Sequence, residues 1–213
     1  GHISLASPLI NKFFSDEICL LLGITSSFMT RLVKGDMLFK SQPQDINMFF
    51  ELCLNANPEF RKALEELKKD NPDNQKGSSC RYELQELTHI INKISVSGIT
   101  LIEQILHYLS DKSRLKEMLA DSRKSMNNLS LKSYKARRKY LEKKVNLLEN
   151  LINSGQTPDL FLIKNLAVIP PSLRPESRYK WKSDDGLNDL YNEVIRNNNA
   201  LKALCSYPHA IMD

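Results

Sequence analysis

Glycine is scarce in this sequence, and its scarcity excludes several kinds of site. Only 7 of the 213 residues are glycine, which is about half of the roughly 7% that is usual in globular proteins. Neither a GxGxxG nor a GxxxxGK[ST] motif occurs, so no glycine-rich loop that cradles a phosphate group is predicted. A turn-dense β-sandwich is disfavoured for the same reason.

Clustered metal ligands and catalytic signatures are missing as well. The cysteines show no CxxC spacing and the histidines form no HExxH pair, so neither a zinc site nor a metalloprotease site is predicted. We predict no catalytic residue and no metal ligand in these residues, and we expect the thiols to be reduced, as in the cytosol. The residues considered are Cys19, Cys53, Cys80, Cys205, His2, His89, His107 and His209.

Long apolar runs are also lacking. The longest, Ile18–Ile24, is far shorter than the roughly 20 residues that a membrane-spanning helix needs. No signal peptide is recognisable. We therefore expect a cytoplasmic protein with no membrane partner. Because the chain begins with Gly1 rather than methionine, we expect it to be either processed or a piece of a longer protein.

Positive charge is concentrated in one part of the chain. The formal net charge is +5, but Asp111–Lys144 contains 12 basic and 4 acidic residues. Such a segment is compatible with a polyanion partner and equally with the solvated face of a helix. Its densest run contains Lys132, Lys135, Arg137, Arg138, Lys139, Lys143 and Lys144.

The spacing of apolar residues predicts a mainly α fold with one or two short β-strands. Gly1–Pro8 is expected to be extended or turn-like, and Leu160–Ile169 is typical of a strand. We divide the chain into a helical segment over 1–40, a helical segment over 41–128 that is a candidate lineage-specific insertion, and a last segment over 129–213. Helices are predicted over residues 10–22, 25–33, 45–55, 58–69, 82–94, 99–109 and 129–153, and from about 183–185 to Pro208. Gly23 is expected to stop the first of these helices, and Thr25 or Ser26 to cap the second. In the helix over 129–153, the basic run is expected to lie opposite an apolar stripe of Leu141, Val145, Leu148 and Ile152.

Two features near the C-terminus favour binding. The loop Arg174–Lys182 combines four cations with Tyr179 and Trp181, and cations with aromatic faces suit phosphates and bases. The same aromatic rings could instead fold back onto the body of the protein. The final helix carries a heptad stripe with Asn197 on it, which predicts a coiled-coil arm that needs a partner helix. The apolar residues of the stripe are Leu187, Leu190, Val194, Leu201 and Leu204.

Three blocks of sequence resemble a known family. They are GHISLASP (Gly1–Pro8), the stretch from Lys143 to Pro171, and VIPPSLRP (Val168–Pro175) followed by LNDLYNEVIRNNNALKAL (Leu187–Leu204). In order and approximate spacing they resemble the β′ subunit of bacterial multisubunit RNA polymerase. The blocks cover roughly 80 residues, and the middle of the chain matches the family only weakly.

The resemblance implies a segment of the clamp of a DNA-directed RNA polymerase. It implies that the loop is the lid beside the RNA–DNA hybrid and that the final helix is the first arm of the clamp coiled coil, where sigma factor docks. The implied partners are the β subunit, the rest of β′, sigma factor, DNA and the hybrid, in a bacterium or an organelle. The implied nucleic-acid-binding residues are Arg174, Arg178, Tyr179, Lys180, Trp181 and Lys182, and the implied docking residues are Asn192, Glu193, Arg196, Asn197 and Lys202.

The resemblance also limits the chemistry expected here. The family's zinc ligands and the aspartates that hold its catalytic magnesium lie outside these 213 residues, so no cofactor is expected in this segment of a nucleotidyltransferase. Members of the family usually carry several arginines on the docking arm, where this chain has Asn192, Glu193 and Asn197. The alternative is a stand-alone α-helical interaction protein, derived from a polymerase segment, that binds sigma factor or nucleic acid.

Overall fold

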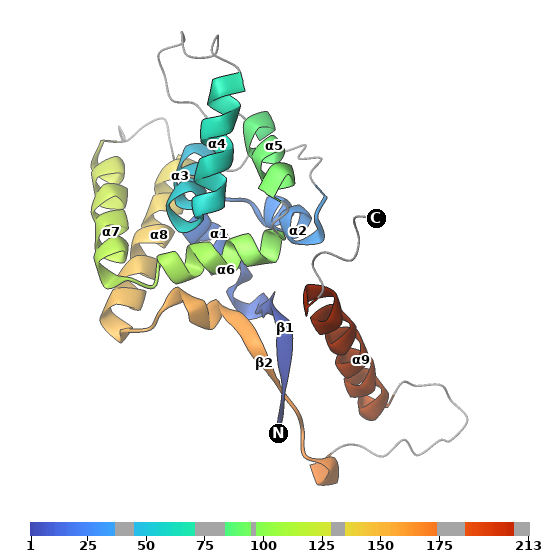
Figure 1. Ribbon diagram of the computed structural model, residues 1–213. Helices are drawn as coiled ribbons and strands as arrows, with labels where there is room; N and C mark the ends of the chain where they lie inside the picture. Colours follow the sequence, from blue (N-terminus) through green and yellow to red (C-terminus); the bar gives the residue numbers. More distant parts are fainter. Residues whose placement is uncertain (37–44, 71–83, 95–96, 129–134, 174–185, 207–213) are drawn as a thin grey trace. The chain divides into compact units, whose positions relative to one another are not determined.

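The computed structural model describes residues 1–36, 45–70, 84–94, 97–128, 135–173 and 186–206. Within these ranges the fold is mainly α with one two-stranded sheet, which confirms the predicted fold class (Figure 1). The chain forms two compact units. One contains Gly1–Leu9 and Ile163–Asp213, and the other contains Ile10–Leu162.

The first unit is built on a pair of antiparallel strands that come from distant parts of the sequence. Strand β1 (His2–Ile10) lies beside β2 (Leu162–Ala167) in Figure 1. The amide of Val168 donates a hydrogen bond to the carbonyl oxygen of Gly1 at 3.1 Å. The short 3-10 helix η4 (Pro171–Leu173) and helix α9 (Leu187–Ser206) belong to the same unit.

The second unit is helical, and its elements follow one another closely along the chain. Seven of the predicted helices have counterparts here at nearly the predicted bounds, and one helix, α7, was not predicted. The elements are η1 (Lys12–Phe14), α1 (Ser15–Leu22), α2 (Ser26–Lys34), α3 (Ile46–Ala56), α4 (Pro58–Asp70), α5 (Leu84–Ile94), α6 (Gly98–Tyr108), α7 (Lys112–Asn127), α8 (Lys135–Ser154) and η3 (Pro158–Phe161).

Side-chain caps explain where several of these helices begin. A polar side chain in front of a helix accepts a hydrogen bond from a backbone amide that the helix itself leaves unpaired. The amide of Phe28 donates to Thr25 Oγ1 at 3.2 Å, as the sequence predicts. Helix α1 ends at Gly23, whose φ of +67° suits glycine. Asp45, Ser97 and Asp111 act in the same way, and so does Asn57 in front of α4.

One apolar core joins the helices of the second unit. Phe28 packs edge to face against Phe49 with ring centroids 5.6 Å apart, and Phe50 packs in the same way against Phe60 at 5.2 Å. All four rings are fully buried, which gives this small unit much of its hydrophobic stabilisation. Helices α7 and α8 lie side by side, and α6 packs against α2 and α3 (Figure 1).

A membrane span would need a long apolar helix, and no single helix among the described residues is long and apolar enough. Two consecutive helices, taken together, are long and apolar enough by length and composition alone. They are Lys12–Leu22 and Ser26–Lys34, with a bend of 104° between them.

Candidate functional site

The predicted lid residues, Arg174, Arg178, Tyr179, Lys180, Trp181 and Lys182, lie outside the described residues. The structure describes the residues on both sides of them. Helix η4 ends at Leu173, and α9 begins at Leu187. The lid assignment therefore stays a prediction.

Helix α9 is held to the edge of strand β1 by one buried side chain. Asn198 is 9% exposed. Its Oδ1 accepts a hydrogen bond from the Ala6 amide at 2.7 Å, and its Nδ2 donates to the Ser4 carbonyl oxygen at 2.9 Å. These two groups project from one edge of the strand, because alternate residues present their backbone groups to the same side. The carboxamide therefore pairs with β1 as a neighbouring strand would.

A second contact fixes the other half of α9. The amide of Ile169, just after β2, donates to the Tyr191 hydroxyl at 3.1 Å. The more covered residues on the helix recur at helical spacing and are Leu187, Tyr191, Val194 and Asn198. The heptad pattern predicts Asn197 on the seam, but Asn197 is exposed here and the buried asparagine is its neighbour Asn198, which the pattern does not predict.

The predicted docking residues lie on the exposed part of α9. Asn192, Glu193, Arg196, Asn197 and Lys202 are all exposed, so the structure leaves them accessible on one helix. Leu190, Leu201 and Leu204 of the predicted heptad stripe are exposed, as is Ile195 outside it, whereas Leu187 and Val194 of the stripe are half-buried. Exposed apolar residues at heptad spacing are typical of a helix that has a partner. The exposed fractions are 47% for Leu190, 41% for Ile195, 40% for Leu201 and 60% for Leu204.

The basic run of α8 divides into cations with different roles. Arg137 pairs with Asp45 at 2.9 Å, and Arg138 pairs with Glu142 at 3.0 Å. Lys144 is buried, whereas Lys139 and Lys143 are exposed. The predicted apolar stripe on the opposite side of the helix is confirmed, because Leu141, Val145 and Leu148 are buried.

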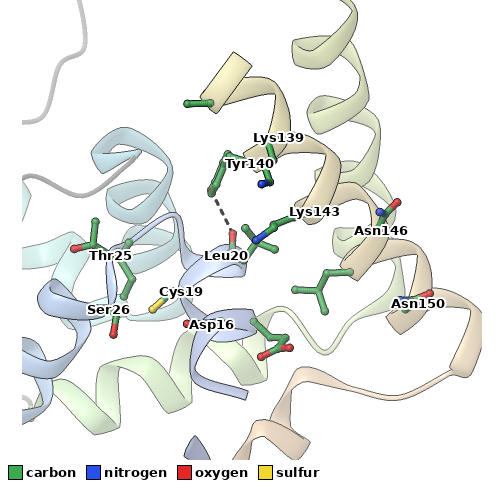
Figure 2. Close-up of a pocket in the computed structure, with 14 residues that line it drawn as sticks. Asp16, Cys19, Leu20, Thr25, Ser26, Lys139, Tyr140, Lys143, Asn146 and Asn150 are labelled. Carbon is green, nitrogen blue, oxygen red and sulfur yellow. Dashed lines mark hydrogen bonds between the residues drawn. The ribbon is translucent and has the colours of Figure 1, made fainter. Parts of the chain in front are cut away.

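The two exposed lysines lie in a groove between α8 and the helices α1 and α2. The groove has a volume of about 770 Å³, and Figure 2 shows Lys139, Lys143, Asn146 and Asn150 along its α8 wall. The other wall carries Asp16 and the N-terminal residues of α2. Cations and carboxylates thus share the groove, and its charges do not select a ligand of one sign.

The buried polar groups of this groove are structural. Tyr140 donates a hydrogen bond to the carbonyl oxygen of Leu20 at 3.3 Å, drawn as a dashed line in Figure 2. Burial raises the pKa of Tyr140 to about 12 and, with the nearby Asp16 carboxylate, raises the pKa of the Cys19 thiol to about 11. Both groups therefore stay protonated and unreactive at neutral pH.

The most suggestive cluster of catalytic residue types lacks the geometry of a nucleophile. Ser110 donates to Asp159 Oδ2 at 2.9 Å, and His107 Nδ1 lies 3.3 Å from the same oxygen. Both groups contact the carboxylate rather than each other, so the serine lacks the hydrogen-bonded base that activation needs. In the described ranges, no group of three histidine, cysteine, aspartate or glutamate side chains could hold a metal ion.

The described residues thus form two units, and helix α9 of the first unit keeps several large apolar side chains exposed. The chain matches the family model described as RNA polymerase Rpb1, domain 1 over residues 1–211, and it belongs to that family. It is 28% identical to the DNA-directed RNA polymerase subunit beta' of Chlamydia trachomatis serovar L2 over 211 residues, which cover 96% of this chain and 13% of that protein.

Other relatives agree with this result. The beta' subunits of Chlamydia trachomatis serovar D and Chlamydia pneumoniae are 29% and 28% identical to this chain over the same coverage. The comparisons confirm the resemblance to β′ that the three sequence blocks predict. The chain spans only 13% of the length of the curated relatives it matches.

Proposed function

We propose that this chain is part of the clamp of a DNA-directed RNA polymerase, where it holds DNA and the RNA–DNA hybrid and docks sigma factor. It acts as a scaffold, while aspartates elsewhere in the polypeptide hold the catalytic magnesium. Its partners are the β subunit, the remainder of β′, sigma factor and nucleic acid, in the cytoplasm of a bacterium or in an organelle. No cofactor is assigned to this segment.

The observation that carries the proposal is the way in which α9 is presented. Two contacts with the strands, through Tyr191 and Asn198, fix one side of the helix. Leu190, Leu201 and Leu204 stay exposed along the flank of that side, and the predicted docking residues are exposed on the same helix. A helix that is fixed on one side and apolar on another is suited to receive a second helix.

Replacing both Leu190 and Leu201 by aspartate tests the proposal in the full-length polypeptide. We expect the unaltered protein to co-purify with β and to capture sigma factor. The double variant is expected to lose most of the sigma capture, because two carboxylates on the stripe oppose helix pairing. Asn199→Asp, which adds one such carboxylate outside the stripe, is the control. Failure of the unaltered protein to bind β, or equal capture by all three proteins, would contradict the proposal.

The lid assignment makes a separate prediction. Replacing Arg174, Arg178, Lys180 and Lys182 by alanine is expected to weaken binding of an RNA–DNA hybrid and to flatten its salt dependence, since fewer counterions are released. The measurement is a titration of labelled hybrid at several salt concentrations. If the dependence of hybrid affinity on salt concentration does not change, the loop does not bind the hybrid. That result would leave the proposed docking role of α9 unaffected.

A further inference from the structure

The basic run of α8 contains one lysine that the proposed function does not use. Lys144 is 3% exposed, and its ammonium group contacts Met48 Sδ at 2.7 Å. Within the described part of the chain, Lys144 takes part in no salt bridge. A buried ammonium group is costly unless an anion or several acceptors surround it, and a thioether sulfur is a weak acceptor.

Lys144 lines a pocket that could hold such an anion. The pocket has a volume of about 350 Å³ and lies between α3, α7 and α8, beside the end of α6. Ser122, on α7, lines it too and is 6% exposed. Among the described residues, its hydroxyl makes no hydrogen bond, and its oxygen is not one of the fully enclosed atoms without a partner, so part of its surface stays accessible. The pocket therefore combines a buried cation with a spare hydroxyl donor, which are the two groups that an oxyanion needs.

The charged groups around the pocket restrict the size and charge of a ligand. Asp45 is already paired with Arg137 at 2.9 Å, and the Arg114 guanidinium stacks on the Tyr108 ring at 3.7 Å. Three more carboxylates, all exposed, belong to the same lining, and they would repel a nucleic acid or another polyanion. They are Glu51, Glu117 and Asp121.

We propose that this pocket binds a small oxyanion with a single charge, of the monocarboxylate class, with the Lys144 ammonium as its cation and the Ser122 hydroxyl as a second donor. The site is separate from the proposed clamp surfaces. Burial, the main cause, lowers the pKa of Lys144 to about 8, a shift that the Arg137 charge enlarges and the Asp45 carboxylate opposes. A bound carboxylate favours the charged amine, so it raises that pKa.

Reductive methylation of lysines in the full-length polypeptide tests this inference. Acetate is the probe, exchanged for chloride at constant ionic strength near pH 7, and peptide mass spectrometry gives the rate at each lysine. Only the neutral amine reacts, so each unit by which the pKa of Lys144 rises is expected to slow its methylation by about tenfold. Lys143, exposed and adjacent, is the internal reference and is expected to keep its rate. Equal rates at Lys144 in both salts, or no methylation there in either, would overturn the proposal.

Two variants provide an independent measurement. Acetate is expected to raise the Tm of the unaltered protein and of Lys143→Met, but not of Lys144→Met, because ligand binding to the folded state stabilises it. Methionine keeps the apolar length of the side chain and removes its charge. An equal rise in all three proteins would identify a general salt effect and contradict the assignment. If Lys144→Met does not fold, the methylation rates of the unaltered protein decide the question.

Discussion

Replacing Gly98 by alanine is expected to destabilise the helical unit by roughly 3 kcal/mol, at the upper end of what overpacking costs. Gly98 is the first residue of α6, and an added Cβ would overlap the backbone carbonyl of Leu32 on α2. A side chain could avoid the added Cβ by changing its rotamer, but a backbone carbonyl cannot. In the Gly98→Ala variant, α2 and α6 must therefore move apart. Urea unfolding followed by circular dichroism measures the loss of stability.

Gly35→Ala is the matched control for this experiment. Gly35 ends α2 with a φ of +71°, and nothing lies within 4 Å of the Cβ that alanine would add. Its replacement is expected to cost only about 1 kcal/mol, the strain of a left-handed conformation. Equal losses for the two variants would show that the close approach of α6 to α2 is not what requires Gly98.

Asn198→Ala is expected to release α9 from strand β1. The change removes both hydrogen bonds of the carboxamide and leaves the Ala6 amide and the Ser4 carbonyl without their partners. Each polar group that stays buried without a partner lowers the free energy of unfolding by about 1–3 kcal/mol. Hydrogen exchange at the Ala6 amide is expected to accelerate strongly. Under the proposed function, sigma capture is expected to fall as well, because α9 is no longer held.

The neighbouring residue provides the control. Asn197 is exposed, so Asn197→Ala is expected to change stability by less than about 0.5 kcal/mol and to leave exchange at the Ala6 amide unchanged. Sigma capture by Asn197→Ala separates docking from folding, because only a direct contact would lower it in this variant. If Asn198→Ala leaves exchange at Ala6 as slow as in the unaltered protein, the carboxamide does not fix α9.

Local signals in the sequence were sufficient to predict most helices. Thr25 and Gly23 begin and end helices as predicted, since caps act on backbone groups a few residues away. Helix α7 was missed because its buried side includes Ser122 beside Leu115, so the apolar period is interrupted. Helix propensity and apolar periodicity do not reveal that a serine is buried when a neighbouring helix covers it.

Long-range pairing could not be predicted in the same way. The extended residues at the N-terminus and the strand near Leu162 were each expected, but their pairing depends on the fold of everything between them. Asn198 gave no signal, because a polar residue on an amphipathic helix is normally exposed. Lys144 was hidden for a related reason, since it lies in a run of exposed cations and only tertiary packing distinguishes it.

The carboxamide of Asn198 has a mechanical consequence. It connects a helix to the backbone of a strand that lies 192 residues away in sequence, and β1 is in turn hydrogen-bonded to β2. A load applied along α9 would therefore pass through the two hydrogen bonds of one carboxamide into the paired main chain of β1 and β2. Helix α9 and strand β1 would then move together.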